Sequence, residues 1–301
     1  MTKHVRSKWH GAYMVAIVMA TCVSALAQSA NEPFRFGSLS VSGGVRTRLE
    51  GWRWFEGQGN TDYTFSGSLA RLALSQSSAR LDWQVELVAP ILLRLPTNAS
   101  GPGAEGQFGL GSTYFTANHS RRNAAMIFPM QAFVRYKTFL GRDSDSLRVG
   151  RFQFTDGAET SPKNATLAAL KTSRVNQRLI GTFAFTHAQR AFYGAHFQHD
   201  TPKFNWTIVG AFPTRGVFQA EGWGVMKTAF AYTSVTRPVA CPKQSGEWRL
   251  LGIYYDDWRS VLKVDNRPVA IRQMDGVAIK LATNGAHFLL QQRLVWALRM
   301  L

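Results

Sequence analysis

The chain has 301 residues, and its 35 Lys and Arg against 18 Asp and Glu give a formal net charge of +17. Such a basic balance favours nucleic-acid binding in a cytosolic protein, but the N-terminus predicts export, so we expect no nucleic-acid partner. After residue 27 no stretch reaches the roughly 18 consecutive apolar residues of a transmembrane helix, which excludes a helical membrane protein.

The first 27 residues have the three regions of a secretory signal peptide. Lys3, Arg6 and Lys8 form a positive start, an apolar run over 12–27 follows, and its last three residues, Ala-Leu-Ala, fit a cleavage site. The run is too short to span a bilayer as a helix. We therefore expect residues 1–27 to be a cleaved signal peptide. Residues 28–301 then form one exported domain of net charge +14, because cleavage removes three cations and no acids from +17.

Short segments of alternating polar and apolar residues predict β-strands throughout the mature part. The clearest is 78–87, where Ser78, Arg80, Asp82, Gln84 and Glu86 alternate with Ala79, Leu81, Trp83, Val85 and Leu87. Successive side chains of a strand point to opposite faces, so one face is polar and the other apolar. In a membrane β-barrel the apolar face meets lipid and the polar face lines the lumen.

The same alternation recurs along the chain with different regularity. It holds over 39–50 and 204–212, and less regularly over 64–76, 146–154, 190–198, 227–236, 247–255 and 277–283. Over 130–138 it places Met130, Ala132, Val134 and Tyr136 opposite Gln131, Arg135 and Lys137, with Phe133 as an exception. Short turn-like connectors at 57–60 and 141–145 interleave with long polar ones at 96–111 and 156–173, as they do in membrane barrels.

Arginines recur on the polar faces of successive predicted strands. If the strands form a barrel, these cations converge on the lumen, where rings of Arg and Lys select anions. The alternative is that they lie on a solvated face or contact lipopolysaccharide phosphates. The candidate pore-lining residues are Arg46, Arg48, Glu50, Arg71, Arg80, Arg135, Lys137, Arg148, Arg151 and Arg178.

Motifs for catalysis or metal binding are missing from the sequence. It has no G-x-S-x-G, H-E-x-x-H or P-loop pattern. His196 and His199 lie three apart in a predicted strand, so they point to opposite faces and make a poor metal site. Cys22 leaves with the signal peptide, and Cys241 alone allows no intrachain disulfide. We expect no enzyme activity, no metal and no cofactor.

Several short collinear segments resemble the alginate export family of outer-membrane porins. They are Arg46-Thr47-Arg48-Leu49-Glu50, residues 147–153 (LRVGRFQ), Arg178-Leu179-Ile180-Gly181, residues 264–268 (VDNRP) and residues 283–287 (TNGAH). The resemblance covers about residues 36–290. It implies an antiparallel transmembrane β-barrel in which Arg46, Arg48, Arg71, Arg135, Arg148 and Arg151 line the pore. It also implies passive passage of an anionic polysaccharide or sugar acid.

The C-terminal tail, about 290–301, departs from this pattern because it lacks regular alternation and a terminal aromatic residue. The family's barrels are also longer. We therefore expect the chain to be a fragment of a longer barrel that cannot close alone, since strand edges left unpaired in lipid are costly. The competing possibility is a smaller barrel in which the 39–50 strand pairs with a strand near 277–290.

Together these features predict an all-β protein of the Gram-negative outer membrane, in contact with lipid and lipopolysaccharide. Its function would be a porin-like channel for anionic polysaccharide or sugar acids through an arginine-lined lumen. The alternatives are a soluble periplasmic β-sandwich that binds or cleaves polysaccharide, or a gene fragment without function.

Overall fold

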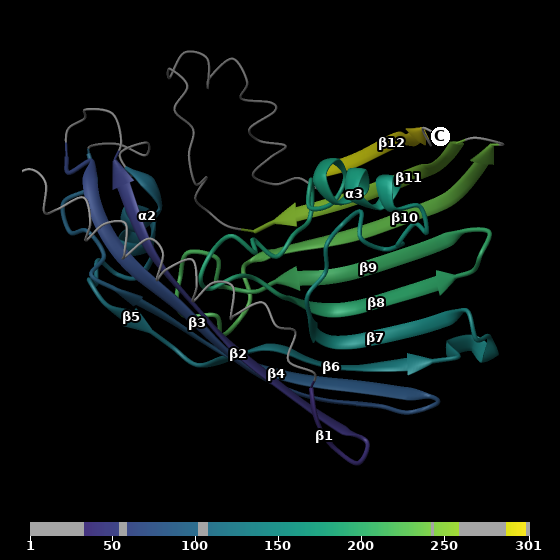
Figure 1. Cartoon of the computed structure of the whole chain (residues 1–301), viewed down its shortest axis with the longest axis horizontal. Helices are drawn as coiled ribbons and strands as arrows, with labels where there is room; N and C mark the ends of the chain where they lie inside the picture. The colour runs from purple at the N-terminus through teal and green to yellow at the C-terminus, as the bar shows by residue number, and fades with distance from the viewer. Residues whose placement is uncertain (1–32, 54–58, 102–107, 242–243, 259–286, 299–301) are drawn as a thin grey trace, which may run out of the picture.

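The computed structural model describes residues 33–53, 59–101, 108–241, 244–258 and 287–298. These residues form one 12-stranded antiparallel sheet whose strands follow one another in chain order (Figure 1). The strands are β1 (Phe34–Phe36), β2 (Leu39–Arg53), β3 (Asp62–Ser77), β4 (Leu81–Leu93), β5 (Ala124–Ala125), β6 (Phe128–Lys137), β7 (Asp145–Phe152), β8 (Phe192–Asp200), β9 (Asn205–Pro213), β10 (Thr228–Cys241), β11 (Gln244–Asp257) and β12 (His287–Leu298). The predicted all-β, antiparallel fold is confirmed.

The sheet has two chemically different faces, as β4 shows. Val85, Leu87 and Ile91 are 38%, 42% and 37% exposed on its convex side. Glu86 and Leu92 alternate with them and are buried on the concave side. This is the polar–apolar alternation predicted for 78–87, with residues 78–80 forming the turn into β4.

A β-bulge interrupts the alternation of β6 at Met130, before the regular part that contains Phe133. The pairing of β4 with β6 shifts register between Glu86 and Leu87, which adds one residue to β6. Phe133 shares a face with Gln131 and Arg135 through regular alternation, and it contacts the Arg148 guanidinium, 5.3 Å from its ring centroid. Met130, placed by the sequence on the face opposite Gln131, is instead fully buried in a cluster with Leu69 and Phe128. That placement was wrong because an uninterrupted alternation cannot anticipate a bulge.

Connectors of two lengths lie at opposite ends of the strands. Residues 37–38, 78–80, 138–144 and 201–204 make tight turns at one end, which we call the short-turn end. Residues 94–127, 153–191 and 214–227 connect strands at the other, the long-connector end. The short connector predicted at 141–145 lies at the short-turn end, and the described parts of the long ones predicted at 96–111 and 156–173 lie at the other. The described residues 59–60 of the short connector predicted at 57–60 lie instead at the long-connector end.

The longest described connector, residues 153–191, folds back over the concave face, and we call it the insert. Its helix α3 (Ala165–Arg174) lies over the strands at the C-terminal side of the sheet (Figure 1). Phe154 and Ile180 of the insert pack with Phe192, Val209 and Tyr232 of the wall in one apolar core. A second core packs α2 (Gly109–Ala117) against β3 and β4 through Tyr114, Phe65 and Leu92.

The two outer strands of the described sheet are β1 and β12. Residues 287–298 of the tail form β12, which pairs with β11 from His287–Tyr255 to Leu298–Gln244. No ladder joins β12 to β1 or β2 among the described residues. The predicted signal peptide and the predicted strand at 277–283 lie outside the described residues. Within the described part of the chain, no helix has the length and apolar character needed to cross a bilayer.

Gly150 in β7 provides a test of the wall. Its φ of +124° disfavours any L side chain, and a Cβ there would clash with the Ala132 carbonyl oxygen of β6. We expect Gly150→Ala to lower the free energy of unfolding by about 1–3 kcal/mol, measured by urea titration in detergent. Gly210→Ala in β9 is the control, because a Cβ added there would meet no other atom within 4 Å. Equal effects of the two substitutions would contradict the strain at Gly150.

Candidate functional site

The concave face carries most of the predicted cations. Two of them, Arg46 and Arg48 of β2, contact the insert. The Arg46 guanidinium donates to the carbonyl oxygens of Thr186 at 2.7 Å and Ala184 at 3.2 Å. The Arg48 guanidinium donates to the Phe185 carbonyl oxygen at 2.6 Å. Three consecutive carbonyls of the insert therefore point at two arginines of the wall. These arginines bind protein backbone as well as facing the concave space.

His187 lies at the centre of this contact. Its Nε2 is 2.9 Å from Glu50 Oε1, and its backbone N–H donates to the Tyr114 hydroxyl at 3.0 Å. The ring occupies space that exists because residue 67 is glycine, since a Cβ there would clash with the imidazole. Burial and the neighbouring Arg48 lower the pKa of His187, which outweighs the opposite effect of Glu50. Burial raises the pKa of Tyr114 to about 12.

Arg71 extends the network to β4. Its guanidinium is 2.7 Å from Glu86 Oε1 and also bonds the Gln189 side chain of the insert. The second Glu86 oxygen accepts from the Gln131 amide at 2.7 Å. The structure thus brings together four predicted residues through a segment of the insert. They are Arg46, Arg48, Glu50 and Arg71, which we call the Arg46–Arg71 group.

The insert is held at its other side by a buried ion pair. Arg249 of β11 lies 2.8 Å from Glu159 Oε1, with side chains only 2% and 1% exposed. The hydroxyl groups of Tyr232 and Ser234 on β10 donate to the same Glu159 oxygen. Glu159 therefore joins the start of the insert to two strands.

A second buried pair follows further along the insert. Lys171 Nζ of α3 is 2.7 Å from Glu247 Oε1 of β11. Burial lowers the pKa of Lys171, although Glu247 acts against this shift.

Asp156 accepts hydrogen bonds from the backbone N–H groups of Leu179 and Ile180, and burial raises its pKa. The bonds of Asp156 tie the start of the insert to residues 179–180 behind α3.

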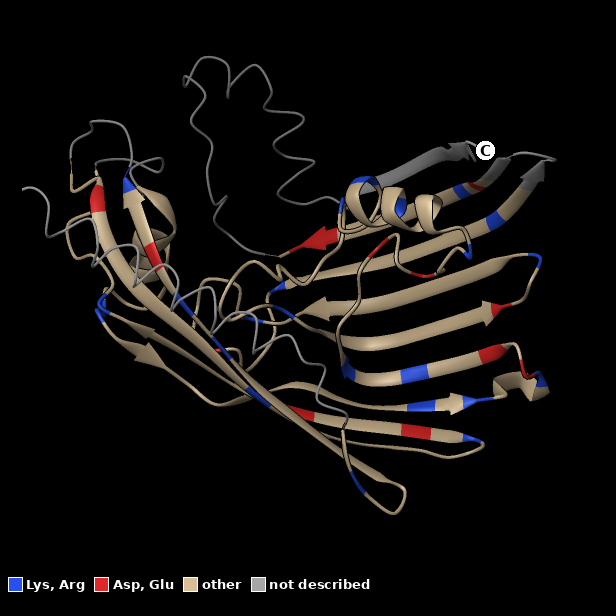
Figure 2. Cartoon of the chain, in the orientation of Figure 1, with Lys and Arg blue, Asp and Glu red and all other residues tan. Residues whose placement is uncertain are grey.

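A further group of predicted residues lies on β4, β6 and β7 toward the short-turn end (Figure 2). Asp82 lies 2.6 Å from Lys137 Nζ and 3.9 Å from the Arg135 guanidinium. Arg148 is opposite Arg135 in the ladder and lies 2.8 Å from His196 Nδ1. The structure brings these cations near one another but apart from the Arg46–Arg71 group.

Three predicted residues fall elsewhere. Arg151 is fully buried, bonding the carbonyl oxygens of Met130 and Gly222 between the rings of Phe128 and Tyr193. Arg178 bonds the backbone of α3 within the insert. Arg80 lies exposed in the turn before β4. None of the three takes part in the two groups described above.

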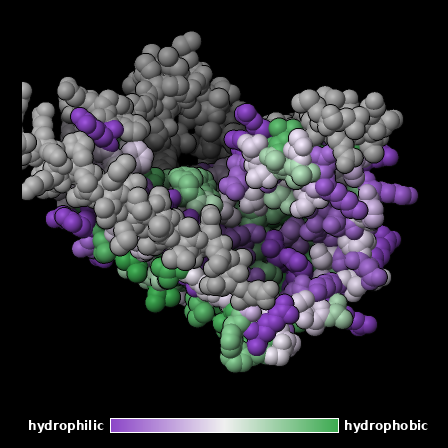
Figure 3. Space-filling model, viewed as in Figure 1, coloured by the Kyte–Doolittle hydropathy of each residue, from purple (hydrophilic) through white to green (hydrophobic). Residues whose placement is uncertain are grey.

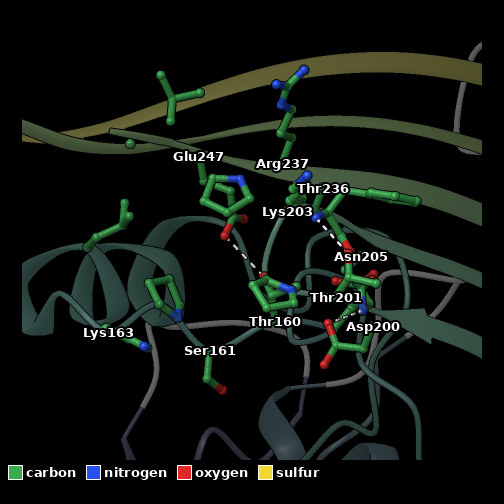
Figure 4. Close-up of a pocket in the computed structure, with 18 of the residues that line it drawn as sticks. Thr160, Ser161, Lys163, Asp200, Thr201, Lys203, Asn205, Thr236, Arg237 and Glu247 are labelled. Carbon is green, nitrogen blue, oxygen red and sulfur yellow. Dashed lines mark hydrogen bonds between the residues drawn. The ribbon is translucent and has the colours of Figure 1, made fainter. Parts of the chain in front are cut away.

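The insert leaves two cavities against the wall. The larger, about 830 Å³, opens between the insert, the 200–205 turn and β10 and β11. Figure 4 shows Thr160, Asp200, Asn205, Thr236 and Glu247 around it. The smaller, about 300 Å³, is bordered by Arg148, Gln153, Glu159, His196 and Gln198. Glu159 borders both cavities. They leave space for a solute beside the insert.

No cluster suited to a metal ion occurs among the described residues, in which three or more His, Cys, Asp or Glu never converge. His196 bonds Arg148, whereas His199 Nδ1 lies 2.5 Å from Asp145. The predicted separation of these two histidines is consistent with these different partners.

The sequence analysis missed five residues that position the insert: Glu159, Lys171, His187, Glu247 and Arg249. Glu247 and Arg249 lie on the polar face of a predicted strand, so their spacing was a usable signal. Glu159, Lys171 and His187 lie in a connector, where no periodicity marks a side chain that packs against a distant strand.

No family model matches the chain, and no curated protein matches it. The resemblance to the alginate export family accordingly stays a prediction. Among solved structures, the chain is similar to the high-pH structure of OprB from Pseudomonas putida, with a TM-score of 0.41 and 12% sequence identity. The match covers 72% of this chain and 52% of that one, so the chain spans about half of that structure's length.

The Glu159–Arg249 pair can be tested by removing its negative charge. Glu159→Gln leaves the Arg249 guanidinium buried without its counter-charge, which we expect to cost about 3–5 kcal/mol of unfolding free energy. Glu221→Gln is the control, because its pair with Arg215 is 41% and 51% exposed and should cost under about 1 kcal/mol. Urea titrations of both variants measure the difference. Similar losses would show that Glu159 does not anchor the insert.

His187 should make the docking of the insert sensitive to acid. Because its pKa is lowered in the folded state, stability is complete above its ordinary value of about 6.5. As the pH falls below that value the free energy of unfolding decreases. The reason is that His187 takes up a proton in the unfolded chain but stays neutral in the folded one. The protection factors of residues 182–191, which are the amide exchange rates corrected for the intrinsic slowing of exchange at lower pH, should therefore fall between about pH 7.5 and 5.5. His187→Gln should weaken this response and the exposed His119→Gln should not. An unchanged response in His187→Gln would contradict it.

Proposed function

We propose that the chain forms the wall of an outer-membrane channel in a Gram-negative bacterium, with the concave face toward the lumen. The observation that carries this proposal is the apolar convex face. Large hydrophobic side chains are exposed there on successive strands: Val45, Leu49, Leu72, Val85, Leu87, Tyr136, Val149, Trp206, Ile208, Phe212 and Tyr254. Figure 3 shows such side chains gathered below the N-terminal strands and hydrophilic ones around the hollow beside them.

An apolar surface that runs over so many strands is unstable in water. In a soluble sandwich a second sheet would cover it, but the described residues form a single sheet. In a membrane barrel lipid covers it, and the interior is polar. The two-sided wall therefore favours the barrel over the periplasmic sandwich.

The insert sets the free space inside this proposed channel. It crosses the concave face between the Arg46–Arg71 group and the Glu159–Arg249 pair. Solutes then pass beside it through the space that the two cavities provide. The insert, held to the wall at both of its sides, narrows the lumen of the proposed channel without closing it.

The finer proposal is that the solute is anionic, a polysaccharide or sugar acid of the alginate kind. Its support is the charge of the concave face. On β2, β3, β4, β6 and β7, Arg46, Arg48, Arg71, Arg135, Lys137 and Arg148 are six cations, and Glu50, Glu86 and Asp82 are three acids. Such an excess of fixed cations favours anions, while the interspersed acids keep each binding step weak enough for release.

The experiment is conductance in planar bilayers. The purified chain should give discrete channels that prefer anions, read from the reversal potential in a salt gradient. Arg135→Gln should reduce the anion preference about twofold, since a unit charge roughly 10 Å from the ion path contributes about 0.4 kcal/mol in water. Arg142→Gln, in an exposed turn, is the control with the same loss of charge.

The following results would overturn the proposed anionic solute or the proposed channel. Cation preference, or equal effects of the two variants, would remove the support for an anionic solute. Folded protein that forms no channels, or that is extracted from cells without detergent, would reject the channel itself.

A further inference from the structure

A small polar cavity opens at the long-connector end, away from the two cavities beside the insert. It measures about 170 Å³ and lies where β4 ends. Residues 94–98 and 122 meet there, joined by a hydrogen bond from the Leu95 N–H to the Arg122 carbonyl oxygen of 2.9 Å. Arg94 and Arg122 border the cavity with Asn60, Thr97 and Asn98.

Among the described residues, the charge at this cavity has one sign. None of the residues that border it is an acid. Arg94, Arg122 and the adjacent Arg121 are exposed, and no ion pair between described residues includes any of them. On the concave face, by contrast, most arginines already bond a carboxylate or a carbonyl. The guanidinium groups here donate to no other side chain or carbonyl among the described residues, and a guanidinium is suited to bidentate contact with phosphate.

The apolar convex face begins directly beside this cationic cavity. Ile91 and Leu93 of β4 are 37% and 43% exposed, and the next stretch adds Met126 and Ile127 at 39% and 64%. Ala125 is paired with Ile91, so the two segments are adjacent. A ligand that fits both features has an anionic group next to apolar chains. That combination is a phosphorylated lipid.

The size of the cavity supports the same ligand. At about 170 Å³ it is smaller than the roughly 300–1,000 Å³ of sites that enclose a whole small molecule. It can hold one charged headgroup while the rest of the ligand lies outside. A saccharide chain in transit would need more room than this.

We infer that Arg94 and Arg122 bind a phosphate of a glycolipid headgroup in the outer leaflet, of the kind that lipopolysaccharide carries. The inference rests on the proposed function, because barrels place their long connectors on the outer side of the membrane. The acyl chains then cover Ile91, Leu93 and Ile127, and Arg121 adds a second cation for the same headgroup. The site fixes lipid to the wall beside the longest strands.

The test measures how much lipid the purified full chain retains. Diphosphoryl lipid A is added to the protein in detergent, and native mass spectrometry counts the bound copies. Arg94→Gln/Arg122→Gln should weaken retention about tenfold or more, since each cation near an anionic lipid surface contributes about 1 kcal/mol. Arg80→Gln/Arg142→Gln is the matched control, because it removes two exposed arginines at the short-turn end.

Two further probes separate the sources of phosphate. The same glycolipid with its phosphates removed should bind poorly, and about 10 mM inorganic phosphate should not displace lipid A, because it lacks the apolar part of the contact. Equal retention by both double variants would overturn the inference, as would tight binding of the phosphate-free lipid. Displacement of lipid A by inorganic phosphate would overturn it too.

The same preparations, placed in planar bilayers of phosphate-free lipid, distinguish the two proposals. Channels that persist without specific lipid retention would reject the lipid site alone. Specific retention without channels would reject the channel assignment and leave the site standing.

Discussion

The buried Glu159–Arg249 pair determines much of what the concave face can do. Two charges that are almost fully buried must remain together, because separating them leaves a charge without solvent or partner. The pair therefore holds the start of the insert against β10 and β11. From there the insert reaches β2 and β3, where its carbonyls meet Arg46 and Arg48. The space beside it and the charges that border that space follow from this attachment.

The wall itself depends on a simpler constraint, the alternation of side chains along each strand. It gives the sheet one apolar face and one polar face. This was accessible from the sequence: the polar and apolar residues of 81–87 fall on the two predicted faces of β4, and Arg46, Arg48 and Arg71 lie on the concave side. The tail lacks regular alternation, yet residues 287–298 pair with β11, because backbone hydrogen bonds accept strands of any side-chain pattern.

The placement of the insert could not be predicted from the sequence, because it depends on contacts between residues that are far apart in the chain. Arg46 and Thr186 are 140 positions apart, and Glu159 and Arg249 are 90. No local pattern in a connector states which strand it will touch. Met130 shows the same limit within a strand, because one bulged residue moved it to the buried side. Arg151 was predicted to line a pore, but the sequence could not show that Gly222 and two aromatic rings would enclose it.

The position of the insert in the chain has a consequence for folding kinetics. The insert lies in the chain between β2, which carries Arg46 and Arg48, and β11, which carries Arg249. Its contacts are of high contact order in both directions, and closing such long loops is slow. The insert can dock fully only when β2, β10 and β11 are all in place, because it contacts each of them. A late or misplaced insert would therefore delay assembly of the last strands, during which exposed strand edges are prone to aggregation.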